Sequence, residues 1–425
     1  MFASLIRKSK SPVAFSILVL VIAVLACAQG TQKSSQPAPA QDSAQLNHYN
    51  ITLKDLPPPE VQRGPVNFSK IIPRPEGADL IAPKGFIVSE YAVDLIKPRW
   101  MQLAPNGDVF VAESEKGQIS ILRDSNNDGK ADERFIFATG LSRPFGMAFQ
   151  NGFLYIGNTD AVVRFKYKSG QTKAEGEAEK IASLPMNGYR EHWTRNLIFS
   201  ADGKKLYVTV GSKSNVNAGE EPMRAAISEM NPDGTNSRIY ASGLRNPLGL
   251  AWNPTTKQLW VAVQERDLIG NDLVPDYVTS VKEGGFYGWP YSYIGQNEDP
   301  RRKGERPDLV QTATVPDVLI QAHSAILGLV FYEGKMFPKE YQGDAFAALH
   351  GSWNRDKRTG YNVIRIKFKN GKPVGGYDEF VKGWMLGEDQ DKVWGRPVGL
   401  LVLKDGSMLI TDDGAGKIWR VSYKK

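Results

Sequence analysis

A short strand pattern repeats along most of this 425-residue chain, and it limits the fold more than any other feature. In each copy, a turn with arginine, proline or glycine leads into an apolar run. A polar turn then leads into a second run of the type Leu-Tyr-Val or Leu-Trp-Val. The copy from Gly243 to Val263 is the clearest. Short apolar runs bounded by turn residues are typical of β-strands, so the chain is predicted to be a series of repeated β-units.

Six copies are present, and most units are roughly 45 to 55 residues long, which is the period of propeller blades. The interval between the fourth and fifth copies is longer, and residues 294–316 within it are predicted to be a loop insertion. The run from Phe86 to Tyr91 is expected to complete the last blade and close the ring. The sequence therefore predicts an all-β, six-bladed β-propeller. A β-sandwich or two β-domains is the alternative, because strands at this spacing occur there too. The second runs are residues 109–112, 154–157, 206–210, 259–263, 345–349 and 408–411.

Composition supports a turn-rich β-protein and argues against a nucleic-acid partner. The chain has 41 Gly and 26 Pro residues, which favours many turns. The net charge is +7, but three of the cations lie in the first thirty residues, which carry no acid. The rest of the chain therefore carries +4, spread over its length. Nucleic-acid binding would require a clustered basic stripe, and none is present in the sequence.

The N-terminus resembles a bacterial lipoprotein export signal. Residues 7–10 are basic, and residues 13–26 form an apolar run that is short for a membrane span. Residues 24–27 resemble a lipobox, in which Cys27 is lipidated and becomes the mature N-terminus. Cys27 is the only cysteine, so no disulfide can form within the chain. A lone buried thiol is the alternative.

Three regions follow from these observations. Residues 1–26 are predicted to be the lipoprotein signal peptide, residues 27–84 the lipidated cysteine with a proline-rich linker, and residues 85–425 the propeller. The expected protein is exported and anchored to a bacterial membrane by more than one acyl chain, which gives stable attachment.

Three histidines occupy corresponding positions near the predicted blade entrances. His192 lies just before the first strand of a blade, beside Glu191, and a neutral histidine there is a candidate general base. A turn histidine bonded to the backbone is an equal alternative. His323 and His350 occupy comparable positions in the fifth blade and are predicted to line the same pocket as cofactor-binding residues.

Arginines recur at the same place in the repeat. If they face the axis, the pocket is cationic and suits a polycarboxylate or phosphate ligand through bidentate contacts. Two or three of them are expected to hold neighbouring carbonyls instead. They are Arg143, Arg195, Arg245, Arg355 and Arg396.

Two loops carry oxygen ligands suited to Ca²⁺. The first runs from Glu265 through Arg266 to Asp272 and is a weak signal, because acidic loops are usually only solvated. The second, residues 124–133, has oxygen ligands at alternate positions and glycine sixth, as in the first half of an EF-hand loop. Its twelfth position is Phe135 rather than glutamate, so a structural Ca²⁺ turn is predicted, with a metal-free Asp/Asn turn as the alternative. The predicted ligand positions are Asp124, Asn126, Asp128, Lys130 and Asp132.

From about Gly85 to Tyr423, the chain resembles the glucose/sorbosone dehydrogenase family of six-bladed propellers, and most closely its sorbosone dehydrogenase-like branch. The resemblance depends on an ordered set of motifs rather than on any single one. They are EHWTRN at 191–196, FSADGKKLYVTVG at 199–211, GLRNPLGLAW at 243–252, the loop at 265–276, GGFYGWP at 284–290, HGSWNR at 350–355 and WGRPVGL at 394–400.

The resemblance implies an oxidoreductase that uses pyrroloquinoline quinone (PQQ) and Ca²⁺ to oxidise sugars or other alcohols. Three departures concern substrate specificity and the Ca²⁺ ligands: Glu191 stands where Asp is frequent, Tyr291–Asp299 lacks a second Ca²⁺ loop, and Glu265-Arg266 replaces Gly-Pro. The implied roles are the catalytic base for His192, the quinone-facing pair for Arg245 and Asn246, a cofactor-side amide for Gln264, Ca²⁺-binding backbone carbonyls for Glu265 and Arg266, carboxylate binding for Arg396 and a cofactor-binding cation for Arg355.

The sequence analysis therefore predicts a lipid-anchored PQQ- and Ca²⁺-dependent sugar or alcohol dehydrogenase. It has no CxxCH haem motif, so an external electron acceptor is expected. One alternative is a Ca²⁺-dependent sugar-lactone hydrolase, which would leave the many arginines unexplained. The other is a non-catalytic propeller that binds carbohydrate or a partner protein.

Overall fold

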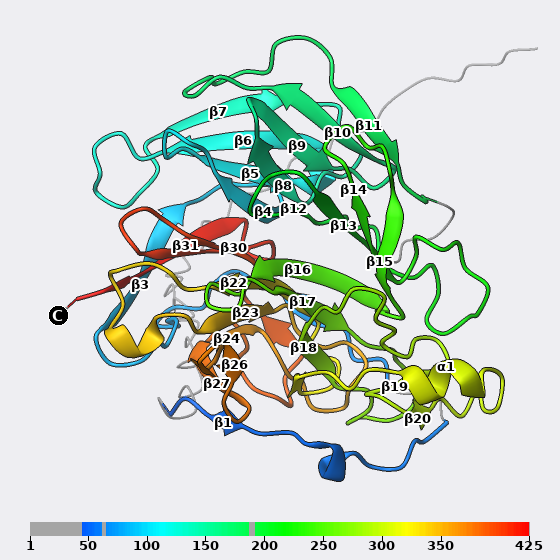
Figure 1. Cartoon of the computed structure of the whole chain (residues 1–425). Helices are drawn as coiled ribbons and strands as arrows, with labels where there is room; N and C mark the ends of the chain where they lie inside the picture. The colour runs from blue at the N-terminus through cyan, green and yellow to red at the C-terminus, as the bar shows by residue number, and fades with distance from the viewer. Residues whose placement is uncertain (1–44, 62–64, 187–191, 425) are drawn as a thin grey trace, which may run out of the picture. The chain divides into compact units, whose positions relative to one another are not determined.

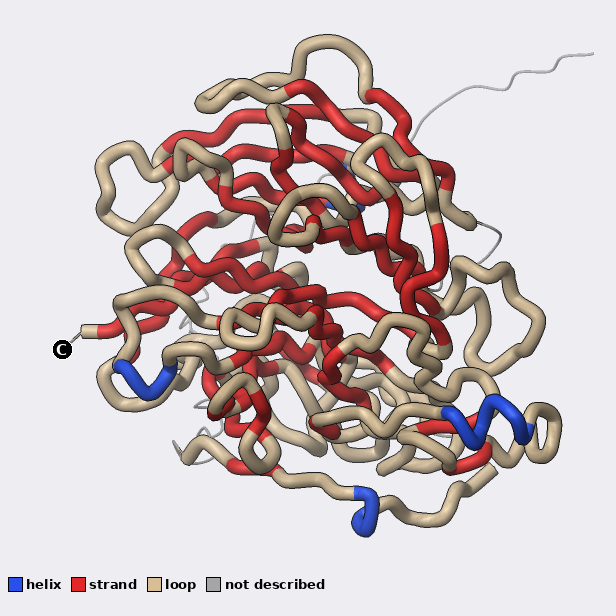
Figure 2. The backbone as a smooth tube through the Cα atoms, in the orientation of Figure 1, coloured by secondary structure: helices blue, strands red, loops and turns tan. Residues whose placement is uncertain are grey.

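Six antiparallel sheets form the blades of a β-propeller in the computed structural model, which describes residues 45–61, 65–186 and 192–424. Almost all the regular secondary structure is β-strand, drawn in red in Figure 2, and the helical segments are short. The first three blades follow chain order from the innermost strand outwards. They are β4 (Pro98–Leu103), β5 (Val109–Glu113), β6 (Gln118–Arg123) and β7 (Glu133–Ala138); β8 (Met147–Gln150), β9 (Phe153–Gly157), β10 (Ala161–Lys166) and β11 (Glu179–Ser183); β12 (Leu197–Phe199), β13 (Leu206–Val210), β14 (Ala226–Met230) and β15 (Arg238–Ser242).

The other three blades have the same order, except that the outermost strand of the last comes from the start of the domain. That strand, β3 (Phe86–Ala92), pairs with β31, so the predicted closure of the ring by this segment is confirmed. The blades are β16 (Asn246–Trp252), β17 (Leu259–Gln264), β18 (Asp276–Ser280) and β21 (Val318–Ile320); β22 (Ile326–Phe331), β23 (Ala345–Leu349), β24 (Asn362–Ile366) and β27 (Tyr377–Val381); β29 (Pro397–Val402), β30 (Met408–Asp412), β31 (Lys417–Tyr423) and β3.

The innermost strands contact one another in a closed circle, in the order β4, β8, β12, β16, β22, β29 and back to β4. Several of their labels gather near the middle of Figure 1. The predicted six-bladed all-β fold is therefore confirmed. It also explains the glycine that recurs in the first run of the repeat. A side chain at Gly249 would lie 2.7 Å from the backbone of Leu327 and Leu329 in the next blade, and one at Gly399 would lie 2.5 Å from the carbonyl of Arg99. Glycine therefore permits close packing between adjacent inner strands.

Apolar side chains from the inner strands fill the axis. Phe145, Leu248 and Val398 each follow the proline of a repeat turn, and each is at most 1% exposed. They share one core cluster with Trp100 and Leu327. Because these side chains occupy the space between the inner strands, polar chemistry is confined to the loops at the ends of the ring.

An insertion, the segment before the first blade and several short turns pack outside the six four-stranded blades. The insertion predicted at 294–316 lies between β18 and β21 and contains α1 (Pro307–Thr312), after β19 (Ser292–Tyr293) and β20 (Asn297–Glu298). The segment before the ring contributes β1 (His48–Tyr49), which pairs with β27, and β2 (Lys70–Ile71), which pairs with β28 (Lys392–Val393). A small ribbon is formed by β25 (Phe368–Lys369) and β26 (Lys372–Pro373), and short 3₁₀ turns occur at Leu53–Asp55, Ser114–Lys116 and Lys339–Tyr341.

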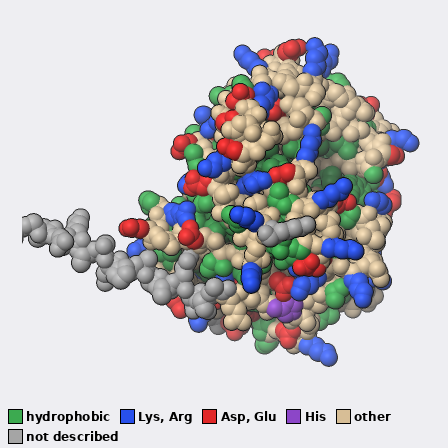
Figure 3. Space-filling model, turned by 90° about the vertical axis from the view of Figure 1, so that its left-hand side faces the viewer, with side chains coloured by type: hydrophobic (Ala, Val, Ile, Leu, Met, Phe, Trp, Pro, Cys, Tyr) green, Lys and Arg blue, Asp and Glu red, His purple; other side chains and the backbone are tan. Residues whose placement is uncertain are grey.

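None of the helices in the described part of the chain has the length and apolarity needed to cross a membrane. On the face shown in Figure 3, basic and acidic side chains are interspersed. Cys27 and the predicted signal peptide lie outside the described residues.

Candidate functional site

The predicted catalytic and cofactor-binding residues lie on loops or strand ends at one face of the ring. In an antiparallel blade, the loop that enters the first strand and the loop that joins the second and third strands lie at the same edge. Entry loops carry Arg143, His192, Arg245, His323 and the backbone of Arg396. The second-to-third-strand loops carry Glu265, Arg266, His350 and Arg355. We call this edge the axial face.

His192 lies at the axial face with one ring nitrogen fixed. Its Nδ1 lies 2.8 Å from the carbonyl oxygen of Ser212 and 3.0 Å from the Ser212 hydroxyl. Donation to the carbonyl requires a proton on Nδ1, which leaves Nε2 with its lone pair. Nε2 has no hydrogen-bond partner among the described residues. Burial, and then the nearby Arg245 cation, lowers the pKa of His192 to about 3, so the ring is neutral at physiological pH.

Arg245 is held in a fixed position by three neighbours. Its guanidinium donates to the Glu265 carbonyl (2.6 Å), the Asn215 side-chain oxygen (2.9 Å) and the Asp267 carboxylate (3.0 Å). Burial would raise the pKa of Asp267, but the charge of Arg245 and the hydrogen bond from His323 outweigh it, so this pKa is lowered. Asp267 therefore stays ionised and fixes the Arg245 cation beside His192.

Asn246 has one side-chain atom without a partner. Its Nδ2 donates to Gln264 Oε1 at 2.9 Å, and Gln264 in turn donates to the Ile326 carbonyl at 3.0 Å. Asn246 is 3% exposed, and its Oδ1 has no hydrogen-bond partner among the described residues. A side chain at Gly211 would lie 2.3 Å from this oxygen and 2.6 Å from His192 Cβ, so glycine brings the two residues together. A buried acceptor without a partner calls for an explanation, and a ligand donor at this site is one.

The surroundings of His323 favour its protonated form, whereas those of His192 favour the neutral form. Its Nδ1 lies 3.2 Å from Asp267 Oδ1, and its Nε2 lies 3.0 Å from the Gly270 carbonyl oxygen. Burial would lower the pKa of His323, but the hydrogen bond to Asp267 outweighs it and the pKa is raised. With both nitrogens facing acceptors, His323 serves as a cation that supports Asp267.

The side chains of Glu265 and Arg266, predicted near a metal, pair with each other instead of facing the axis. Both are 0% exposed, with Arg266 Nε 3.0 Å from Glu265 Oε2. Arg266 also donates to the carbonyls of Pro290 and Ser292 and to Asp299. In the described ranges, no group of three or more His, Cys, Asp or Glu side chains is arranged to hold a metal ion. The Glu265 carbonyl, one predicted Ca²⁺ ligand, already accepts from Arg245.

His350 belongs to a second cluster, formed by the fifth, sixth and first blades. Its Nε2 lies 2.9 Å from Asp413 Oδ1, and Arg99 donates to the other Asp413 oxygen. Burial, and then Arg396, lowers the pKa of His350 to about 3 in spite of Asp413. Burial would raise the pKa of Asp413, but His350 and Arg99 hold it far below its usual range. Arg396 donates to the His350 carbonyl at 3.0 Å.

The ring of Trp193, the residue after His192, contacts two arginines, one of which, Arg99, belongs to the His350 cluster. The Arg143 guanidinium lies 4.1 Å from the Trp193 ring centre, and Arg99 lies 5.4 Å from it. Arg143 is exposed and has no ion-pair or hydrogen-bond partner for its guanidinium among the described residues. It is therefore a cation available to a ligand.

Two further predicted arginines bind protein groups. Arg355 donates to the Asn271 carbonyl at 2.9 Å and pairs with Asp272 at 2.7 Å. Arg195 is 1% exposed and donates to the carbonyls of Pro185, His192 and Thr194, which makes it a structural residue of the His192 loop.

The loop with the EF-hand-like spacing lies away from all these groups. It joins the third and fourth strands of its blade, β6 and β7, and therefore lies at the opposite edge of the ring. Asp124 accepts from the backbone N–H groups of Asp128 and Gly129, Asn126 accepts from that of Asp128, and Asp128 accepts from that of Lys130. Asp132 accepts from Ser125. Calcium binding there stays a prediction.

Sequence reasoning missed four residues that organise the axial face, namely Arg99, Ser212, Asn215 and Asp413. Ser212 and Asp413 each come within two residues of the end of a second strand, β13 or β30, so the repeat itself carried a usable signal for them. Asn215 bonds Arg245, Asp267 and Trp289 across the loops, and nothing in its local sequence indicates this.

Comparisons with known proteins agree with the motifs and the fold. Residues 150–352 match the family described as Glucose / Sorbosone dehydrogenase, and residues 301–424 match one described as TrAA12-like. An uncharacterised protein of Borreliella burgdorferi is 28% identical over 81% of this chain and 91% of its own length. Quinoprotein glucose dehydrogenase B of Acinetobacter calcoaceticus is 24% identical over 48% of this chain and 52% of its own length.

A solved structure shows the same architecture. The holo form of the PQQ domain of pyranose dehydrogenase from Coprinopsis cinerea superimposes with a TM-score of 0.69, covering 82% of this chain and 98% of that domain at 18% identity. The relatives with assigned activities are sugar dehydrogenases, several of them named as quinoproteins or PQQ-dependent enzymes. Sequence and fold together therefore match a glucose/sorbosone dehydrogenase-like family of six-bladed propellers.

Proposed function

We propose that this protein is a PQQ-dependent dehydrogenase that oxidises a sugar or related alcohol at the axial face. The observation that carries the proposal is His192, a neutral imidazole with a free Nε2 beside the unpaired oxygen of Asn246. The relatives named as quinoprotein glucose or pyranose dehydrogenases support the choice of reaction.

The charges at the axial face fit a flat polycarboxylate such as PQQ. Four of the arginines there, Arg99, Arg143, Arg245 and Arg396, have only two carboxylates, Asp267 and Asp413, as direct ion-pair partners among the described residues. Arg143 is exposed and unpaired among the described residues. An excess of guanidinium groups around one edge suits several ligand carboxylates.

When bound, the quinone supplies the acceptor for the hydride that leaves the substrate carbon. The protein supplies the proton acceptor and the positioning. His192 Nε2 takes the proton of the substrate hydroxyl as the carbonyl product forms, while Ser212 fixes the ring. Asn246 Oδ1 is placed to accept a hydrogen bond from a ligand donor, and Asp267 keeps Arg245 in place.

Calcium enters the proposal only as an ion bound together with the quinone. The described side chains do not form a metal centre, and the Glu265 carbonyl is engaged by Arg245. The predicted Ca²⁺ ligands are the backbone carbonyls of Glu265 and Arg266, so a Ca²⁺-dependent reaction stays part of the proposal.

The test is a titration of the purified full chain with PQQ, with and without Ca²⁺, followed by aldoses and polyols with an artificial electron acceptor. Saturable binding with turnover supports the dehydrogenase. If PQQ binds only when Ca²⁺ is present, the result supports a site that holds the quinone and the ion together. Absence of binding at micromolar PQQ would contradict the proposal and leave the lactone hydrolase or the non-catalytic propeller.

We also propose that Cys27 carries a lipid that anchors the exported protein to a bacterial membrane, with electrons passing to an external acceptor. The motif at residues 24–27 supports this assignment. Labelling of cells with radioactive palmitate should mark the wild-type protein and not Cys27→Ser. Equal labelling of the two proteins would refute the anchor.

A further inference from the structure

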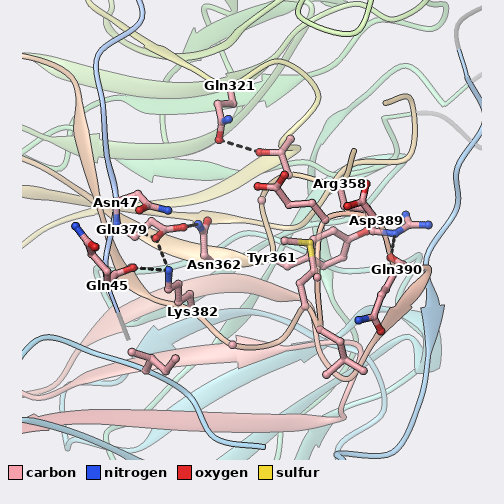
Figure 4. Close-up of a pocket in the computed structure, with 18 of the residues that line it drawn as sticks. Gln45, Asn47, Gln321, Arg358, Tyr361, Asn362, Glu379, Lys382, Asp389 and Gln390 are labelled. Atoms are coloured by element: carbon pink, nitrogen blue, oxygen red, sulfur yellow. Dashed lines mark hydrogen bonds and ion pairs between the residues drawn. The ribbon is translucent and has the colours of Figure 1, made fainter. Parts of the chain in front are cut away.

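A polar cavity of about 580 Å³ lies beside the axial face, between the fifth and sixth blades. Its walls come from the loop before β24, the end of β27 with the loop that follows, the residue Gln321 ahead of β22, and the segment around β1. Figure 4 shows Asn362, Glu379 and Lys382 on one side and Arg358 and Gln390 on the other. We call it the rim cavity. Its volume lies in the range of small-molecule sites.

The rim cavity offers no free cation from its described lining. Arg358 is 2% exposed, and its guanidinium donates to the carbonyls of Asn67, Phe68 and Gln390. Lys382 pairs with Glu379 at 2.9 Å and donates to the Gln45 carbonyl at 2.7 Å. Glu388 and Asp389 add exposed carboxylates. The buried Arg358 guanidinium is held by carbonyls and Lys382 pairs with Glu379, so an anionic ligand would meet the exposed carboxylates of Glu388 and Asp389.

The side-chain amides of Asn362 and Gln321 in the lining can bind a neutral polar ligand. Asn362 is 7% exposed, and its Oδ1 has no hydrogen-bond partner in the described part of the chain. Its Nδ2 lies 3.3 Å from Glu379 Oε1. Gln321 accepts from Thr359 at 2.9 Å through Oε1, which leaves its Nε2 donor unused among the described residues. One buried acceptor and one donor on a shared wall match the hydroxyl groups of a polyol.

The remaining lining provides apolar surface. Met385 and Leu386 are half-buried, and Tyr49 and Tyr361 also line the cavity. A wall that combines apolar atoms with a few fixed polar groups is the usual composition of a ligand site. Hydroxyl groups would bind the amides, and C–H groups would contact the apolar atoms.

We propose that the rim cavity binds a neutral saccharide of one or two rings, at a site separate from the axial cluster. The proposal does not depend on the reaction at the axis. The two sites share the loop between β23 and β24, because Tyr361 donates to the Ser352 carbonyl at 2.9 Å and its ring centre lies 5.8 Å from Arg396. A bound saccharide would therefore lie on the same face as the proposed reaction.

The experiment measures saturation-transfer NMR of cellobiose and maltose with the full chain and no PQQ, with gluconate as the anionic control. At least one neutral disaccharide should give a signal that the rim variants weaken, whereas any gluconate signal, which the unpaired Arg143 at the axis can produce, should be unchanged in those variants. Leu386→Trp places a large ring in the cavity and should weaken binding at least tenfold. Asn362→Leu removes the unpaired acceptor and should weaken it by up to about tenfold, the value of one neutral hydrogen bond.

His192→Ala is the matched control at the axis and should bind the disaccharide as the wild type does. Melting temperatures identify a variant that fails to fold, in which case the other rim variant decides. The proposal is overturned if neither disaccharide binds, if a rim variant weakens the gluconate signal as much as the disaccharide signal, if a folded Leu386→Trp variant binds the disaccharide normally, or if His192→Ala abolishes binding. Because PQQ is absent, the result does not depend on whether the proposed dehydrogenase activity exists.

Discussion

The residues around His192 and Arg245 at the axis and the rim cavity lie on the same face of the ring. Both sites contain basic side chains, but these side chains have different partners in the two sites. At the axis, Arg143 has no ion-pair partner among the described residues, and four arginines meet two directly paired carboxylates. In the rim cavity, Arg358 is buried and held by carbonyls, and Lys382 pairs with Glu379. The number of basic residues therefore does not decide which ligand a site prefers. The decisive property is whether a cation retains a donor that the protein does not use.

The histidines extend this comparison within the axial face. His192 and His323 both lie near Asp267, but only His323 bonds it directly. The pKa of His323 is raised, whereas that of His192 falls to about 3. Burial and Arg245 therefore favour a neutral His192, whereas the direct bond to Asp267 favours a charged His323.

The largest expected effect is on turnover in His192→Ala. Loss of a general base lowers kcat by about 10²- to 10⁴-fold. PQQ binding should change much less, because Arg143, Arg245 and Arg396 remain. Steady-state kinetics and a PQQ titration on the same preparation separate the two quantities. Normal turnover in a folded His192→Ala variant would remove His192 from the mechanism.

A smaller effect is expected for Arg143→Gln, which removes the unpaired axial cation. PQQ affinity should fall by about tenfold, as expected for one charged hydrogen bond at an exposed position. The affinity of the wild type for PQQ should also weaken as salt rises, whereas neutral saccharide binding in the rim cavity should not.

Arg306→Gln is the matched control for that variant, because Arg306 pairs with Asp308 on the insertion outside the axial cluster. It should bind PQQ with wild-type affinity. If Arg143→Gln also binds PQQ normally, the excess of positive charge at the axis is not what holds the cofactor.

The smallest effect is on the pH dependence of stability. The folded pKa of His192 is about 3, below the usual 6.5, so the unfolded chain takes up the proton first as pH falls. Stability should therefore decrease from about pH 6.5 towards pH 3. His192→Gln should flatten this slope, and His192→Gln combined with His350→Gln should flatten it further, since the pKa of His350 is also about 3. Urea denaturation between pH 4 and 8 measures the slope. An unchanged slope would show that neither ring is held neutral by the fold.

Local sequence was sufficient to predict where the functional loops would lie. The first and second runs of each repeat became β-strands, and the loops beside them carry His192, Arg245, His323 and His350 at one edge. This follows because strand direction alternates in an antiparallel blade, so a position in the repeat fixes a position on the ring. The same reasoning could not give the charge state of any one of these side chains.

The ion-pair and hydrogen-bond partners of these side chains are set only when the ring closes. Asp413 lies 314 residues from Arg99 and 63 from His350, and Asn215 reaches Arg245 from a loop 30 residues away. The resemblance assigned the backbone carbonyls of Glu265 and Arg266 to Ca²⁺, and this stays a prediction, whereas the fold buries both side chains against each other and against Asp299. Sequence by itself determined the six blades and the face on which polar chemistry gathers, because both depend on a local repeat. The tertiary structure decided which charges are neutralised and which remain for a ligand, because those partners come from different blades and meet only in the assembled propeller.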